Sequence, residues 1–224
     1  MSTPPNLLND DGTASMASMF MMSHHGFRRD LQRFERALTR PAGELRSDAL
    51  KQEWQSYHGA LHGHHSMEDA NIFPNMKQQS AALAACVDGL SHDHQRIDPL
   101  LEKGDAAFAG LPASAGQALA VVRELQELLA PHLATEESEI IPMLRGAKQF
   151  PAPPGEAELE MYAQGFAWSA QGIAPEVLEQ VFALLPAALT ARLPAARAAF
   201  DARCEKVWGS AQAGNATTPI PNGP

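Results

Sequence analysis

Two short segments place an imidazole and a carboxylate at a spacing that can hold a metal ion. His64 is followed by Glu68, and His132 by Glu136, each pair four residues apart in sequence that otherwise predicts helix. In an α-helix this spacing leaves the two side chains about 40° apart, one turn along the same face. Both side chains of a pair can therefore coordinate the same metal ion from a single helix.

The two segments also resemble each other beyond these pairs. The first continues to Phe73-Pro74 and the second to Ile141-Pro142, and the distance from histidine to proline is the same in both. Two helical hairpins of similar plan, paired about a pseudo-twofold axis, would give this repeat. Such a pairing would bring the polar side chains of both halves to one level of a helical core.

Two further histidines lie where a helix ordinarily carries an apolar residue. The stripe of the first predicted helix reads Phe20, His24, Phe27, Leu31, Phe34 and Leu38, in steps of four and three. In the third predicted helix, His94 lies between Leu90 and Ile97 in the same rhythm. Either histidine alone could be an ordinary core residue, but their match to the two HxxxE pairs favours a shared metal site.

Burial of these groups calls for a compensating cation. An unpaired imidazole or carboxylate is costly in an apolar core, and two carboxylates together cost more. Imidazoles and carboxylates without a thiolate suit iron or manganese and suit structural zinc poorly. Because each glutamate can bridge two ions, a dinuclear site is favoured. The predicted ligands are His24, His64, Glu68, His94, His132 and Glu136.

Tyr57 is a further candidate, because it precedes His64 by seven residues and is nearly eclipsed with it on a helix. Its phenol could ligate iron or hydrogen-bond a bound ligand; the alternative is a core aromatic residue with a satisfied hydroxyl. Asp98, four residues after His94, could accept a hydrogen bond from an imidazole N–H or be a plain surface acid.

The remaining histidines are weaker candidates, because they leave the apolar stripes. They are His25, His58, His62, His65 and His92. Asp69 and Glu137 each follow a predicted ligand glutamate directly and are expected to face solvent.

The elements that would position these residues are all helical. Helices are predicted over residues 14–39, 44–73, 79–108 and 117–144, with short loops between them. Pro74 is expected to end the second helix, because proline cannot continue the hydrogen-bond ladder. The predicted fold class is all-α, an up-down-up-down four-helix bundle with an additional C-terminal helical extension.

Composition predicts the domain organisation. Residues 1–14 are expected to be a disordered lead-in, 15–147 the bundle, 148–208 a linker and helical extension, and 209–224 a disordered tail. The helical extension contains no histidine. The predicted chemistry therefore belongs to the bundle.

Charge and cysteine usage narrow the classes of partner. A formal net charge of −9 argues against nucleic acid and against an anionic membrane surface. No apolar run is long enough to span a bilayer. The two cysteines are far apart and form no CxxC pair, as expected for reduced thiols in a cytoplasmic protein.

With these motifs the sequence resembles the hemerythrin-like, HHE cation-binding family over about residues 16–146. The matching features are His24 followed by Arg28-Arg29-Asp30-Leu31, His94 within Asp93-His94-Gln95-Arg96-Ile97, and the two HxxxE segments. The resemblance implies a non-haem di-iron centre in a four-helix bundle, with two iron ions and a bridging oxo or hydroxo group. By position, it implies imidazole ligation by His24, His64, His94 and His132, with Glu68 and Glu136 bridging.

The chain departs from the oxygen-carrying members of that family. Those have an HxxxH pair on the third helix and an Asp-ending motif on the fourth, whereas here the third helix offers only His94 and the fourth ends its motif with Glu136. The four predicted histidines leave a set of five such ligands, counted apart from the two glutamates, one short. His25, His58 or Tyr57 would have to supply the fifth.

The resemblance leaves three functions open. The first is binding or sensing of a small ligand such as oxygen or nitric oxide. The second is an enzyme that decomposes hydrogen peroxide in a catalase-like reaction, or another protective oxidoreductase. The third is iron holding without turnover.

Overall fold

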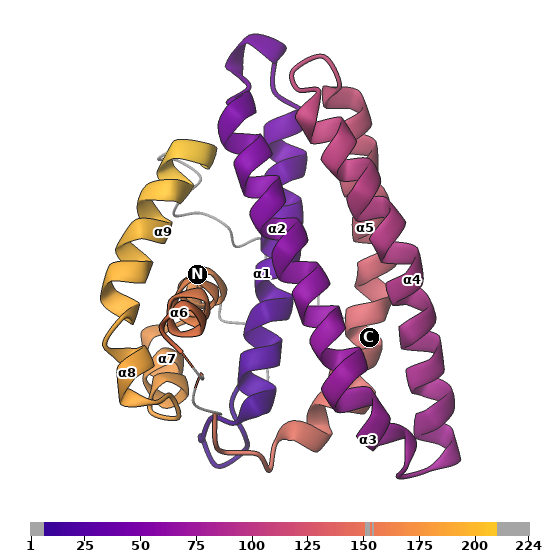
Figure 1. Cartoon of the computed structure of the whole chain (residues 1–224), viewed down its shortest axis with the longest axis vertical. Coiled ribbons are helices and arrows are strands. Elements are labelled where there is room, and N and C mark those ends of the chain that lie inside the picture. Colours follow the sequence, from indigo (N-terminus) through magenta and orange to yellow (C-terminus); the bar gives the residue numbers. More distant parts are fainter. Residues whose placement is uncertain (1–6, 151–152, 154, 210–224) are drawn as a thin grey trace. The chain divides into compact units, whose positions relative to one another are not determined.

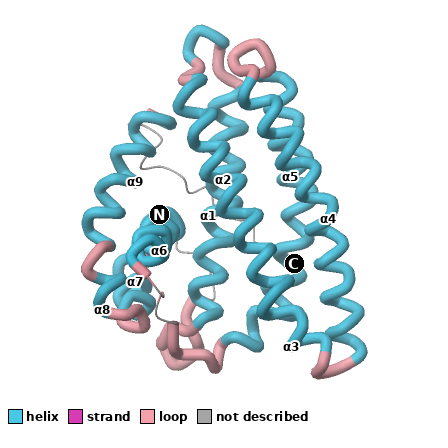
Figure 2. Tube along the Cα trace, viewed as in Figure 1, coloured by secondary structure: helices cyan, strands magenta, loops and turns pink. Residues whose placement is uncertain are grey.

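Helices and turns make up the described part of the chain, residues 7–150, 153 and 155–209 of the computed structural model (Figures 1 and 2). No strand occurs among these residues, which confirms the all-α fold class. Two compact units can be distinguished. One is Phe27–Pro142, and the other combines Met1–Gly26 with Met143–Pro224.

The unit Phe27–Pro142 contains the helices of the bundle. Helix α1 (Met16–Leu38) enters it at Phe27 and is followed, after the 3₁₀ turn η1 (Ala42–Glu44), by α2 (Ser47–Met67), α4 (Ala81–Ala109) and α5 (Ala115–Thr135). Figure 1 shows α2, α4 and α5 side by side, and α4 packs on both of the others. Because short connections join successive helices, their directions alternate, as in the predicted up-down-up-down bundle.

The second helical segment does not end at Pro74 as predicted. Helix α2 passes into a π-helical turn, η2 (Glu68–Ile72), and then into α3 (Phe73–Lys77), which carries the proline in its first turn. Helix α5 likewise passes into the π-helical turn η3 (Glu136–Ile140) and the 3₁₀ turn η4 (Ile141–Leu144). The wider turn lets the chain continue through a proline, which cannot donate to the ordinary four-residue ladder.

An aromatic cluster sets the distance between α2 and α4. The Trp54 ring stacks on Phe108 with centroids 4.4 Å apart, and its Nε1 donates to Oδ1 of Asp105 at 2.8 Å. Gly104 faces the same indole, and a Cβ atom there would overlap the ring. The glycine is therefore required by the close approach of the two helices.

The second unit contains α6 (Glu156–Ala170), α7 (Pro175–Phe182), α8 (Ala187–Thr190) and α9 (Leu193–Trp208). Helix α6 packs against α9 and α8. None of the described helices has the length and apolar character that crossing a bilayer requires.

The N-terminal segment of this unit differs in part from the predicted disordered lead-in over residues 1–14. Leu7 and Ala14 are buried, and the Asn9 backbone N–H donates to the carbonyl of Thr13 at 2.9 Å. Residues 1–6 lie outside the described residues, as does nearly all of the tail predicted over 209–224.

Candidate metal centre

The two HxxxE pairs have the same local geometry. Nε2 of His64 lies 3.2 Å from Oε1 of Glu68, and Nε2 of His132 lies 3.3 Å from Oε1 of Glu136. Both glutamates are only 1% exposed. Each glutamate is also the first residue of a π-helical turn. The repeat seen in the sequence is therefore repeated in the structure.

His94 of α4 joins the first pair. Its Nε2 lies 3.7 Å from Oε2 of Glu68, and its Nδ1 lies 2.9 Å from Oδ2 of Asp69. Asp69 was expected to face solvent, and its side chain is 43% exposed, yet it reaches the imidazole. An ionised Asp69 favours the proton on Nδ1 and leaves the Nε2 lone pair directed toward Glu68.

Asp98, the other acid considered for the role of imidazole partner, lies elsewhere. Its Oδ1 is 3.3 Å from Nδ1 of His62, and both side chains are about half exposed. Asp98 therefore contacts the imidazole of an exposed histidine and none of the predicted ligand histidines.

His132 of α5 has an acid behind it as well. Oδ2 of Asp93 lies 3.6 Å from its Nδ1, while Oδ1 of the same aspartate accepts a hydrogen bond from Nη1 of Arg96 at 2.9 Å. Asp93 also lines a surface groove of about 610 Å³ between α4 and α5. Asp93 thus lies near His132 on one side and lines the groove on the other, and Nε2 of His132 faces the buried carboxylate of Glu136.

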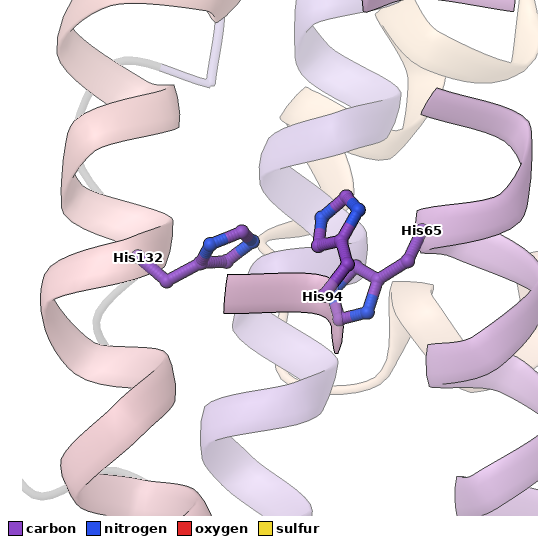
Figure 3. Close-up of side chains that lie close together, drawn as sticks. All are labelled: His65, His94 and His132. Atoms are coloured by element: carbon purple, nitrogen blue, oxygen red, sulfur yellow. The ribbon is translucent and has the colours of Figure 1, made fainter. Parts of the chain in front are cut away.

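A third imidazole meets these two, although its position in the sequence does not indicate this. His65 of α2 points toward His94 and His132 (Figure 3), with ring centroids 4.1 and 5.3 Å away. It is 3% exposed, although the sequence predicts that it lies off the apolar stripe. The stripe of a core-facing helix is at least about 100° wide, so the positions three and four residues after the buried Leu61 both fall within it.

Two groups of possible ligand atoms result within Phe27–Pro142. One nitrogen from each of His65, His94 and His132 lies within 4.8 Å of the other two, and the same limit holds for one ligand atom each of His64, Glu68 and Glu136. Through the contacts of Glu68 with His94 and of Glu136 with His132, the two groups adjoin.

The electrostatics of this cluster fit a cation. Burial raises the pKa of Glu68 well above the ordinary glutamate range, and the nearby carboxylates of Glu136 and Asp69 raise it further. A positive ion between the carboxylates would remove this penalty and keep both ionised. The donor set of imidazoles and carboxylates, without a thiolate, suits iron or manganese.

His24 is fully buried on α1 and belongs to the unit that includes Met1–Gly26. It precedes Phe27 by three residues, on the same face of the helix, and the Phe27 ring lies 5.2 Å from the ring of His64. Its role as a ligand remains a prediction.

Tyr57 is buried in an aromatic environment. Its ring packs edge-to-face on Phe27 and Phe34 and stacks on Trp54. Its hydroxyl has no hydrogen-bond partner among the described residues. Burial, and then the charge of Asp30, raise the pKa of the phenol well above its ordinary value. The hydroxyl is therefore a proton donor at neutral pH.

Two other residues considered for the open ligand place have different partners. Nε2 of His25 lies 3.2 Å from the carbonyl oxygen of Gln171, and Nδ1 of His58 lies 2.9 Å from Oδ1 of Asp105. Neither belongs to the two groups of ligand atoms.

Comparison with known proteins agrees with this geometry. A family model described as the hemerythrin HHE cation binding domain matches residues 15–144, more than half of the chain, including both HxxxE pairs and His94. Comparison with curated proteins and with solved structures finds no significant match. The chain belongs to the hemerythrin HHE cation-binding family.

Proposed function

We propose that this protein holds two iron ions in the bundle, with a bridging oxo or hydroxo group, and that this centre binds or reacts with oxygen, nitric oxide or hydrogen peroxide. One observation carries the proposal. Two buried glutamates, each paired with an imidazole in the same HxxxE geometry, adjoin in the core. Such a cluster is costly without cations and favourable with them.

The proposed ligands are the six residues that the sequence indicated. His94 and His132 face Glu68 and Glu136 through Nε2, which suits these glutamates to bridge two ions. His24 is assigned because it lies one turn from Phe27, the residue whose ring contacts His64.

An iron pair, when bound, supplies Lewis acidity and redox electrons to a small ligand. The chain supplies the rest. Asp69 fixes the orientation of the His94 imidazole by a hydrogen bond, and the buried aromatic residues around the cluster limit the access of water. Tyr57 is assigned as a hydrogen-bond donor to the small ligand, because its raised pKa keeps the phenol protonated.

Metal analysis and kinetics test the proposal. The purified protein is expected to contain close to two irons per chain, and His132→Ala and Glu68→Ala to lose them. His92→Ala is the control, because His92 is exposed. Zinc alone, or no metal after reconstitution with ferrous salt, would refute the proposal.

The reaction is assigned by a second measurement on the iron-loaded protein. Rapid conversion of hydrogen peroxide to oxygen, lost in His132→Ala, would identify the peroxide-decomposing enzyme. A stable and reversible spectral change with oxygen or nitric oxide would identify a binding protein. If neither response is observed, iron holding without turnover is the remaining function. An unchanged spectrum in Tyr57→Phe would remove the phenol from the centre.

A further inference from the structure

His65 breaks the internal repeat of this chain. The two HxxxE segments match at His64 with His132 and at Glu68 with Glu136, but the residue after the second histidine is Leu133. Leu133 is fully buried, and His65 is almost as buried. The bundle therefore accepts an apolar side chain at this place in the repeat, and packing does not require an imidazole there.

The His65 ring lies among side chains that can ligate a metal. His65 comes from α2, His94 from α4 and His132 from α5, and the three converge in Figure 3. One nitrogen of each lies within 4.8 Å of the other two. The His94 and His132 rings are also 5.0 Å apart between centroids. Three buried imidazoles from three helices can form a nitrogen donor set for one ion when the His65 ring, which stacks on His94 with 16° between the ring planes, turns its lone pair toward that ion.

The acids behind two of these rings indicate which nitrogen each presents. Asp69 lies 2.9 Å from Nδ1 of His94, and Asp93 lies 3.6 Å from Nδ1 of His132. The hydrogen bond with Asp69 favours N–H at Nδ1 of His94 and leaves its Nε2 as a lone-pair donor toward the interior, and the negative charge of Asp93 near Nδ1 of His132 favours the same arrangement without a hydrogen bond. Both rings are thus prepared to bind a cation rather than an anion.

We propose that His65 is a third imidazole ligand of the metal ion held by His94 and His132. This inference rests on the proposed iron centre. Helix α4 offers only His94 to the site, and His65 supplies a further imidazole from α2. It also makes the two metal positions unequal, because the second half of the repeat has Leu133 where the first has His65.

The test compares the full-length protein with three variants. His65→Leu introduces the residue that the chain itself carries at position 133, and His65→Gln removes the imidazole but keeps a polar side chain. His92→Gln is the matched control on an exposed histidine. Each protein is prepared without metal, and its melting temperature is measured. Ferrous iron is then titrated anaerobically against a competing chelator.

The expected result has two parts. Without metal, His65→Leu melts at a higher temperature than the wild type, because it replaces a buried polar ring with an apolar side chain. In the titration, both His65 variants bind one of the two irons at least ~100-fold more weakly. The reason is that the loss of a residue that only hydrogen-bonds to a ligand already lowers metal affinity about 10- to 100-fold. X-ray absorption of the loaded protein should show fewer imidazoles per iron. His92→Gln should match the wild type throughout.

A packing role for His65 gives the opposite pattern. In that case His65→Leu lowers the melting temperature of the metal-free protein and leaves both iron affinities unchanged, which overturns the inference. If His65→Leu does not fold, the titration of His65→Gln decides in the same way. A wild-type protein that binds no iron refutes the proposed function itself, whereas one that binds two irons with unchanged affinity in both variants refutes only the role of His65.

Discussion

Asp69 and Glu137 occupy equivalent places in the two halves of the repeat but contact different partners. Oδ2 of Asp69 lies 2.9 Å from Nδ1 of His94, whereas Oε1 of Glu137 lies 2.5 Å from Nη1 of Arg28. A carboxylate behind an imidazole fixes the tautomer and the ring orientation, while an ion pair between partly exposed side chains contributes little to stability. The first acid therefore supports an imidazole of the proposed metal site, whereas the second forms an ion pair with Arg28.

Replacement of Asp69 should weaken metal binding without unfolding the protein. Asp69→Asn is expected to lower the affinity for ferrous iron by about 10- to 100-fold, because His94 loses the acceptor that holds its ring. The measurement is a chelator competition. Glu137→Gln is the control and should bind iron like the wild type. Equal losses in both variants would show that the effect is general electrostatics and not the orientation of His94.

At the scale of helices, the π-helical turns determine which residues return to the core after each glutamate. The backbone N–H of Phe73 bonds to the carbonyl of Glu68, and that of Ile141 to the carbonyl of Glu136, each five residues back. This brings the fifth residue back toward the face of the glutamate, where a regular α-helix would turn it away. Both residues are buried, and the Phe73 ring stacks on His94 with centroids 5.5 Å apart.

The packing of α2 against α4 can be tested at Gly104. Gly104→Ala places a methyl group against the indole of Trp54 and is expected to lower the free energy of unfolding by about 1–3 kcal/mol, as overpacking does. Gly59→Ala on the neighbouring helix is the control, since no atom lies within 4 Å of the added Cβ. It should raise that free energy by about 0.5–1 kcal/mol. Urea denaturation measures both, and equal effects would contradict the close approach.

At the scale of the whole molecule, the metal site couples ionisation to folding. The raised pKa of Glu68 means that the metal-free folded state binds this proton more tightly than the unfolded state. The free energy of unfolding of the metal-free protein therefore falls as the pH rises from the ordinary glutamate range through the raised value. A cation at the site reverses the effect, because it stabilises the ionised carboxylate.

The variant Glu68→Gln should remove this part of the pH dependence. Without metal, it is expected to be more stable than the wild type at neutral pH and to lose less stability as the pH rises above the ordinary glutamate range. Glu102→Gln, at an exposed position, is the control. Urea denaturation at each pH gives the comparison, and identical pH profiles for all three proteins would contradict the assignment to Glu68.

The sequence alone indicated the bundle and the two HxxxE pairs, because both depend on the helix period. A spacing of four puts His64 beside Glu68, and His132 beside Glu136, whatever the rest of the chain does. The helix bounds also follow from local signals, except where the π-helical turns carry the chain past Pro74.

Only the tertiary structure decided the contacts between helices. His65 and Asp69 meet His94 from another helix, and such a meeting depends on how far each helix is rotated about its axis and shifted along its neighbour. Local periodicity does not specify these two quantities, because they result from the packing of the whole core. For this reason the sequence indicated the pairs within each helix, while the third imidazole and the acid behind His94 appeared only in the folded chain.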